Sequence, residues 1–398
     1  MIKSLTNQKL YGLVAGLMSL LLMAFVATPA QAQMGDGELP KVDVGGAVAS
    51  DAQAILVSEF DNDDFDTSLG FNRVAAQIQT NVQFSENVSG YMELSAEPEE
   101  NTNFSKVTTN IDFVYVNVNV AENLMVQAGT PGIGISNFPR WSDGALVQGN
   151  PLVGNSVAQT GTAGNGGAKL IGSYPSFGFD VTVTRNFGGG QDVNAAGQKG
   201  TGTGVDIYGR ARYTGADIFN LGAGVAFATG NKGLAIANGD GDYYNVPAGI
   251  QTGGVNAPSG FSNHPTLPSD VMFQVDGEVT PGALSANAAL GYASQSATGS
   301  APDPAAIFGV LGAKYDVNDS FFIAGRYSVT SDQTDYASDL DKSSIWRAQL
   351  GVGYTYEATM LKLEYANQSQ VSENDTSSPF ANQSRNWQAI TAQFSVAF

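Results

Sequence analysis

The stretch from Trp387 to Phe398 reads WQAITAQFSVAF and decides the predicted fold. Apolar residues stand at positions 390, 392, 394, 396 and 398, with Thr391, Gln393 and Ser395 between them. Side chains of a β-strand point alternately to its two faces, so this segment has one apolar face and one polar face. The pattern is typical of a strand in a transmembrane β-barrel, which has lipid on one side and water on the other.

The same alternation recurs through the chain as hairpins. The clearest is near 309–328, where Asn318-Asp319 favours a chain reversal. Similar hairpins are expected near 74–96, 111–130, 167–186, 204–229, 270–293 and 344–368. Further strands at about 46–58 and 387–398 bring the count to about sixteen, an even number that closes an antiparallel barrel. The predicted fold class is therefore all-β, a transmembrane antiparallel β-barrel with short periplasmic turns and long extracellular loops.

Two of the outer connections are much longer than ordinary links between strands. The third runs over about 131–166 and the fifth over about 230–269, whereas most connections have about 4 to 6 residues. Aromatic residues flank the short turns, and others lie near the opposite strand ends, as in the two interface girdles of a membrane barrel. Long loops of this kind usually carry function or are disordered.

The amino terminus has the features of a secretory signal peptide. Lys3 and Lys9 precede an almost wholly apolar run over 10–27, and Ala30-Gln31-Ala32 offers small residues for cleavage. We expect residues 1–32 to be removed and 33–398 to form a single barrel domain. The alternative is a permanent anchor, because an apolar run of about 18 residues can just span a bilayer.

Composition narrows the classes of function. The chain has 18 Lys and Arg against 37 Asp and Glu, a formal net charge of −19, which argues against nucleic acid as a partner. It has no cysteine and a single histidine, His264, so thiolate metal sites are absent. No serine-hydrolase elbow, phosphate loop or paired-histidine zinc motif occurs. We expect no enzymatic activity and no cofactor.

Acidic clusters are the candidates for binding ions. They contain Asp61, Asp63 and Asp66 in the first outer loop and Asp240 and Asp242 in the fifth. The first cluster lacks the glycine that a calcium-binding EF-hand loop has at its sixth position. The reading we favour is a solvated acidic rim, and loosely bound Ca²⁺ or Mg²⁺ is the alternative.

About half of the scarce basic residues of 33–398 fall on the polar faces of the predicted strands. They are Lys169, Arg210, Arg212, Lys314, Arg326, Arg347 and Lys362, with Arg73 as a further candidate. If the third loop folds inward, Arg140 and Asp143 within it would meet or oppose them across water and create a transverse field. The alternative is that each basic side chain lies near an interface and reaches toward lipid head groups.

Two stretches of the sequence resemble a known family. The stretch Lys314 to Ser328, with its turn at Asn318-Asp319, and the stretch Trp346 to Tyr365 look like late hairpins of Gram-negative general porins. The plan of signal peptide, about sixteen strands, long third loop and terminal phenylalanine covers the whole chain. The resemblance implies an outer-membrane barrel with an inward-folding third loop at about 131–166. It also implies a homotrimer, insertion by the barrel-assembly machinery, and contact with outer-membrane lipid and lipopolysaccharide.

The leading functional hypothesis is a pore for passive diffusion of small hydrophilic solutes and ions. A substrate-selective channel for sugars or anions is the first alternative. A sugar channel should present a ladder of aromatic residues, but Tyr91, Tyr115 and Tyr208 face inward on scattered strands. An anion channel should concentrate basic residues at its narrowest point. A further alternative is a non-conducting barrel that anchors surface loops. We expect mild cation preference, because inward acidic and basic residues are mixed and the outer loops are acidic.

Overall fold

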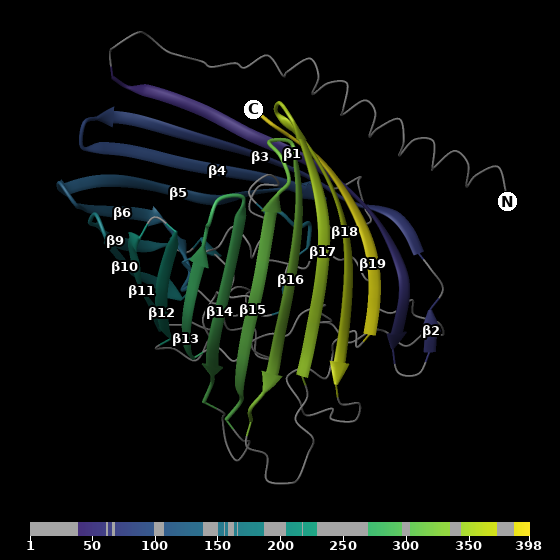
Figure 1. The fold of residues 1–398 in the computed structure, drawn as a ribbon. Coiled ribbons are helices and arrows are strands. Elements are labelled where there is room, and N and C mark those ends of the chain that lie inside the picture. The colour runs from purple at the N-terminus through teal and green to yellow at the C-terminus, as the bar shows by residue number, and fades with distance from the viewer. Residues whose placement is uncertain are drawn as a thin grey trace, which may run out of the picture.

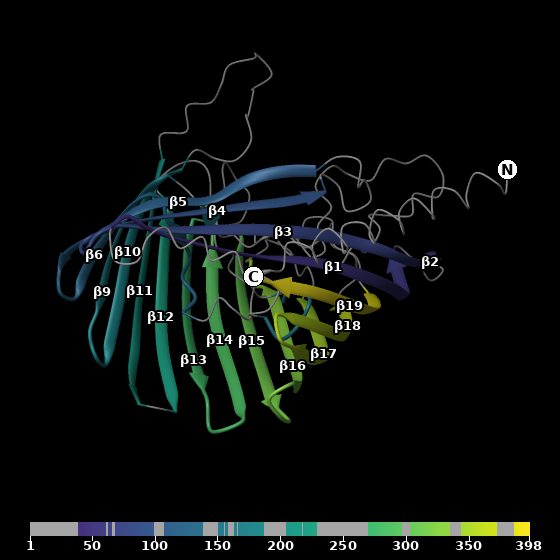
Figure 2. The ribbon, with the colours of Figure 1, turned by 90° about the horizontal axis from the view of Figure 1, so that it is seen from above.

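The computed structural model forms a closed antiparallel barrel of sixteen strands. It describes residues 39–60, 63–65, 68–98, 107–137, 150–154, 156–157, 163–164, 166–186, 204–216, 218–228, 270–296, 303–334, 344–371 and 386–398. Viewed from above, β3 to β5 lie along one side of the ring and β13 to β16 along the opposite side (Figure 2). Within the described part of the chain, no helix is long and apolar enough to cross a membrane.

Each wall strand pairs with the next along the chain, as the ribbon shows (Figure 1). The wall strands are β1 (Lys41–Phe60), β3 (Ser68–Ser85), β4 (Val88–Pro98), β5 (Val107–Ala121), β6 (Leu124–Thr130), β9 (Gly167–Ser173), β10 (Phe177–Asn186), β11 (Gly204–Ala216), β12 (Phe219–Ala228), β13 (Val271–Val279), β14 (Leu284–Ser294), β15 (Ala305–Asp316), β16 (Phe321–Asp332), β17 (Ser344–Tyr356), β18 (Thr359–Val371) and β19 (Asn386–Ala397). The part of the chain that the structure describes has three further, short strands. The strand β2 (Asp63–Phe65) folds back on β1 and joins the same sheet, and β7 (Gly132–Ile133) and β8 (Ala163–Gly164) form a sheet of their own.

The barrel closes where its first and last strands meet. The ladder between β1 and β19 runs from the pair Ala47 and Ala397 to the pair Glu59 and Asn386, with one irregularity after Ile55. Beyond it, Gly46 and Phe398 exchange two backbone hydrogen bonds of 2.9 Å. The alternating pattern at 387–398 therefore forms the closing strand of the ring.

The seven hairpins predicted from the sequence are all present, and the predicted fold class is confirmed. In the hairpin of β15 and β16, the Asn318 side-chain oxygen accepts hydrogen bonds from the backbone N–H groups of Ser320 and Phe321, each 2.9 Å long. At the turn after β13, Gly282 adopts a φ of 62°, which glycine tolerates without a steric penalty. These turns reverse the chain where the local residue types favour it.

The outward side chains make an apolar surface that suits hydrocarbon. Leu311 and Leu350 are 60 % exposed, whereas Arg326 and Ser328, on the opposite face of the wall, are 3 % and 0 % exposed. Outward aromatic rings near the short turns include Phe84, Tyr174, Phe177, Tyr213, Tyr315, Tyr354 and Tyr356, and those near the other strand ends include Phe227, Phe273, Tyr292, Tyr327 and Tyr365. This distribution matches the lipid-facing band and the two aromatic girdles of a transmembrane barrel.

Candidate functional site: the inner wall and the third loop

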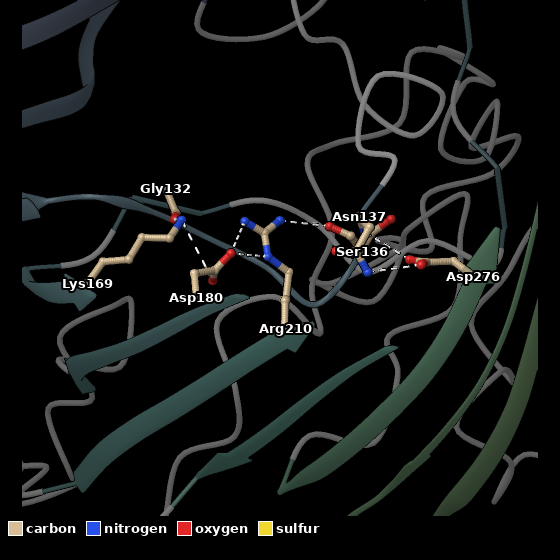
Figure 3. Close-up of polar contacts among 7 residues, drawn as sticks. All are labelled: Gly132, Ser136, Asn137, Lys169, Asp180, Arg210 and Asp276. Carbon is tan, nitrogen blue, oxygen red and sulfur yellow. Dashed lines mark hydrogen bonds and ion pairs between the residues drawn. The ribbon is translucent and has the colours of Figure 1, made fainter. Parts of the chain in front are cut away.

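The first part of the third loop lies against the inner face of β12 and β13. The backbone N–H of Asn137 donates to Asp276 Oδ2 at 2.8 Å, and the Asn137 side-chain amide donates to Asp276 Oδ1 at 2.9 Å. Gln274, two residues earlier on β13, also donates to Asp276 Oδ2 at 2.9 Å. A single carboxylate, which accepts through both oxygens, therefore ties the loop to the wall (Figure 3).

Arg210 makes a second tie to the same part of the loop. Its guanidinium contacts Asp180 Oδ2 through Nε at 2.7 Å and through Nη2 at 2.6 Å. Its Nη1 donates to the backbone carbonyl of Ser136 at 2.8 Å. Beside this pair, Lys169 Nζ donates to the carbonyl of Gly132 at 2.8 Å and lies 4.0 Å from Asp180 Oδ1 (Figure 3).

The register of the wall explains how these groups meet. Arg210 on β11 stands directly beside Asp180 on β10 and Gly224 on β12. Because Gly224 has no side chain, the loop backbone can approach the wall at this point. A Cβ atom at Gly224 would lie 2.1 Å from the carbonyl oxygen of Ile135, and one at Gly222 would lie 2.0 Å from Asn137 Nδ2. The two glycines are the wall positions on which this part of the loop rests.

The later part of the third loop is held by β16, β17 and β18. Glu364 accepts hydrogen bonds from the backbone N–H groups of Val153 at 2.5 Å and Gly154 at 3.3 Å. The Gly154 carbonyl accepts from Arg326 and, at 3.1 Å, from Gln349 Nε2. Gln349 also contacts Arg326 Nε at 2.8 Å and Glu364 Oε1 at 3.1 Å, so the three side chains form one network around the loop backbone.

Further along, Val157 makes a two-sided backbone contact with β16. Its N–H donates to Ser328 Oγ at 3.1 Å, and its carbonyl accepts from Thr330 Oγ1 at 2.6 Å. The described residues of the loop thus reach from the wall around β9 to β13 across to the wall at β16 to β18. Both ends of this reach are held mainly by polar side chains that the alternation predicts to face inward.

An apolar patch on the inner wall also contacts the loop. Loop residues Ile133, Ile135 and Val157 are buried in one cluster with wall residues from β11 to β17: Tyr208, Ala226, Met272, Ala293, Ala306, Phe308 and Ile345. The sequence reasoning missed this patch because it assigned the inner face to polar residues. Apolar residues at inward positions of β13, β15 and β17 were the signal that could have revealed it.

The structure places the other predicted basic residues at several depths of the wall. Arg347 and Lys362 are 0 % and 2 % exposed, and Arg347 donates to Gln368 at 2.7 and 3.0 Å and lies 5.0 Å from the Trp387 ring. Arg212 is exposed. Lys314, near the turn after β15, pairs with Asp316 at 2.7 Å.

Several predicted residues cannot be placed against this wall. Arg140 and Asp143 lie outside the described residues, as do His264, Asp61, Asp66, Asp240 and Asp242, while Asp63 is described only as part of β2. The expected field between Arg140, Asp143 and the wall arginines therefore stays a prediction. What the described residues do show is that Arg210 and Arg326 contact the loop backbone directly. Among the described residues, no three His, Cys, Asp or Glu side chains are grouped as a metal site.

The inner face of β3 to β5 has a different character. Tyr91 and Tyr115 stand opposite each other in the ladder of β4 and β5, and their rings stack with centroids 5.1 Å apart. They are neighbours, so the impression of scattered tyrosines was wrong for this pair, whereas Tyr208 is fully buried in the apolar patch. The Tyr91 hydroxyl donates to Glu93 Oε2, and Gln79 Nε2 donates to the same oxygen at 3.2 Å.

Comparison with known proteins finds likeness in structure alone. No protein-family model and no curated protein sequence matches the chain. The anion-selective porin from Comamonas acidovorans superposes with a TM-score of 0.58 at 13 % identity, covering 90 % of this chain and 100 % of the porin. The outer membrane channel DcaP of Acinetobacter baumannii gives 0.57 at 13 % identity, covering 90 % and 97 %. OmpT of Vibrio cholerae, folded in vitro and in trimer form, gives 0.55 at 12 % identity, covering 91 % and 100 %.

These structures share the architecture of the chain over nearly its whole length, although their sequences have diverged far from it. The resemblance to porins drawn from the sequence is therefore confirmed at the level of the fold. The chain is a closed sixteen-stranded barrel of the porin type.

Proposed function

We propose that the protein is an outer-membrane channel through which small hydrophilic solutes and ions diffuse passively. One observation carries the proposal: a closed ring of strands has an apolar, aromatic-belted outer face and an inner face that holds most of its charged side chains. Such a ring can reside in hydrocarbon and still offer water a polar path. The shared fold with an outer membrane channel and a porin supports this reading.

The third loop gives the proposed channel its selectivity by size. Its backbone is tied to the inner wall at Asp276 and Arg210 on one side and at Arg326 and Glu364 on the other. A segment held inside a barrel narrows the path, and a narrow polar path selects solutes by size and charge. No tight binding site is needed for this function, and we propose no catalytic one.

The cellular setting follows from the same proposal. Residues 1–32 would direct export, and the barrel-assembly machinery would insert the remaining chain beside lipopolysaccharide. A homotrimer is supported by the trimer form of the OmpT structure and by the small and branched outward residues of the early strands, such as Val74, Ala76 and Val114. Cross-linking in mild detergent that detects only monomers would contradict the trimer and leave the channel proposal intact.

Conductance of the refolded chain 33–398 in a planar bilayer tests the function. We expect stepwise openings with a steady, nearly ohmic current, because the path is permanent and water-filled. Detergent alone and heat-unfolded protein are the controls. A folded barrel that never conducts would contradict the proposal and favour a barrel that only anchors surface loops. Saturable sugar or anion flux far above that of other solutes would favour a selective channel.

A further inference from the structure

A small cleft lies on the inner wall at the end of the barrel where β15 turns into β16. Its described lining comes from that turn, from the neighbouring ends of β17 and β18, and from Pro151 of the third loop. The cleft has a volume of about 120 Å³. A cavity of roughly 150 Å³ is large enough to hold a benzene molecule. The cleft therefore has room for a small solute of a few heavy atoms.

Packed apolar side chains form the floor of the cleft. Phe322 stands opposite Gly353 in the ladder of β16 and β17, and a Cβ at Gly353 would lie 2.0 Å from the Phe322 ring. The ring thus occupies the space that a side chain on the neighbouring strand would take. Leu152 of the loop is buried in one cluster with Phe322, Ala324 and Met360 of the wall. A floor packed in this way is in place before a solute arrives, which lowers the cost of binding.

The loop segment beside the cleft is held on both sides of Pro151. Before it, Asn150 Oδ1 accepts a hydrogen bond from the Leu152 N–H at 3.1 Å. After it, Glu364 of β18 accepts from the Val153 N–H at 2.5 Å. Pro151 itself is buried. The cleft thus has a fixed wall on the side of the loop as well.

Charged side chains of both signs stand in the cleft and remain in reach of water. Lys314 Nζ lies 2.7 Å from Asp316 Oδ1, and the two side chains are 30 % and 47 % exposed. The same ammonium group lies 4.9 Å from the centre of the Phe322 ring, so it is directed along the floor. Asp319, in the turn, also lines the cleft and is exposed. The cleft therefore offers one cationic group and two carboxylates to a solute.

A solute that carries both charges close together matches this arrangement. A carboxylate beside Lys314 and an ammonium beside Asp316 or Asp319 each gain charge-assisted hydrogen bonds. A simple anion would be repelled by the two carboxylates, and a simple cation by Lys314. In an α-amino acid the ammonium and the carboxylate are bonded to the same carbon atom, so both can be held at once. The hydroxyl-bearing residues Ser320 and Thr355 line the same cleft and add neutral hydrogen-bonding groups.

We propose that this cleft is a binding site for small zwitterionic solutes of the class of the small α-amino acids. Lys314 holds the carboxylate of the solute, and Asp316 and Asp319 hold its ammonium group. The site goes beyond the proposed diffusion function, because it selects one class of solute on the inner wall. Since the charges are partly exposed, each contact is weak and the solute exchanges rapidly.

Titration of the refolded, isotopically labelled chain 33–398 with L-alanine tests the site by nuclear magnetic resonance. We expect the backbone amide signals of Ser320 and Thr355 to shift in a saturable way, while that of Gly282, in the turn after β13, does not. Lactate has a hydroxyl in place of the ammonium group, and alaninamide lacks the carboxylate, so each should bind much more weakly than alanine. L-phenylalanine should also bind more weakly, because its side chain exceeds the space in the cleft.

A pair of lysine variants tests which charge holds the solute. Lys314→Gln should weaken alanine binding about fivefold, because it removes a charge-assisted hydrogen bond at a partly exposed position. The matched control is Lys41→Gln, which removes the same charge from an exposed position on β1, outside the cleft. We expect this control to bind alanine as the wild type does. If Lys314→Gln does not fold, Asp319→Asn replaces it and should also weaken binding.

The outcomes separate this inference from the proposed function. The inference is wrong if alanine leaves Ser320 and Thr355 unshifted, if lactate or alaninamide binds as well as alanine, or if the cleft variant binds alanine as well as Lys41→Gln does. A conducting barrel with any of these results remains a channel. A barrel that binds alanine in this cleft and never conducts would overturn the proposed function and leave the site intact.

Discussion

Gly224 is a wall residue against which the backbone of the third loop lies in close contact. A side chain there would overlap the Ile135 carbonyl, and its register neighbours Arg210 and Gln274 both belong to the groups that hold the loop. A glycine in a strand usually weakens it, so its presence often marks the close approach of another backbone. The absence of one methyl group at this position therefore lets the loop reach its polar anchors.

The change Gly224→Ala should displace the loop without breaking the barrel. The new Cβ would lie 2.1 Å from a backbone oxygen, which must move, and such overpacking costs about 1 to 3 kcal/mol. We expect a lower unfolding midpoint in detergent and a changed single-channel conductance. The control is Gly325→Ala, whose Cβ would meet its nearest atom at 3.6 Å. Equal behaviour of the two variants would show that the loop does not depend on this contact.

At the level of secondary-structure elements, polar side chains of the wall fix two stretches of the third loop to two different groups of strands. Asp276 holds 136–137 against β12 and β13, while Glu364 and Arg326 hold 153–154 against β16 to β18. Alternation predicted that these side chains face inward, since their neighbours in the strand are apolar. It could not predict their partners, because contacts between a loop and a distant strand leave no local pattern.

Asp276→Ala should loosen the first anchor of the loop. It removes both hydrogen bonds from Asn137, and losing hydrogen bonds to a charged acceptor costs roughly 2 kcal/mol or more. We expect the Asn137 amide to exchange with solvent roughly ten- to thirtyfold faster, since local opening governs such exchange, and the open-channel current to fluctuate more. Glu278→Ala on the same strand should change neither quantity. Unchanged exchange at Asn137 would mean that other contacts hold the segment.

The apolar patch shows where sequence reasoning at the element scale reaches its limit. Met272, Phe308 and Ile345 stand at inward positions, so β13, β15 and β17 carry apolar residues on both faces there. A strict alternation of polar and apolar residues does not account for inward apolar side chains. In the structure they are buried in one cluster with Ile135 of the loop, and removing this apolar surface from water stabilises the docked loop. The patch could be predicted only by assuming that a segment of the chain, here the third loop, packs inside the barrel.

At the scale of the whole molecule, the fold could be predicted because it repeats one local rule. Hairpins such as those at Asn318 and Gly282 reverse at turns that their own residues favour, and the alternating faces of each strand dictate which side meets lipid. The register of closure could not be predicted in this way. The sequence shows that β1 and β19 exist, but the pairing of Ala47 with Ala397 depends on the tilt and stagger accumulated around the ring.

Closure at the seam gives a last prediction. Gly46 exchanges two backbone hydrogen bonds with Phe398, and a Cβ there would lie 2.5 Å from the Gln77 carbonyl oxygen and 2.7 Å from the Phe398 ring. Gly46→Val should therefore part β1 from β19 and weaken those two bonds, at a cost of about 2 kcal/mol. Because valine itself favours strands, the matched control is Gly309→Val, whose Cβ would lie 3.6 Å from its nearest atom, at an ordinary contact distance. We expect Gly46→Val to refold with lower yield and to lose its compact mobility on gels at a lower temperature than wild type. Because an open seam would expose unpaired strand edges, the variant should also aggregate sooner, and refolding equal to that of Gly309→Val would show that the ring closes without this contact.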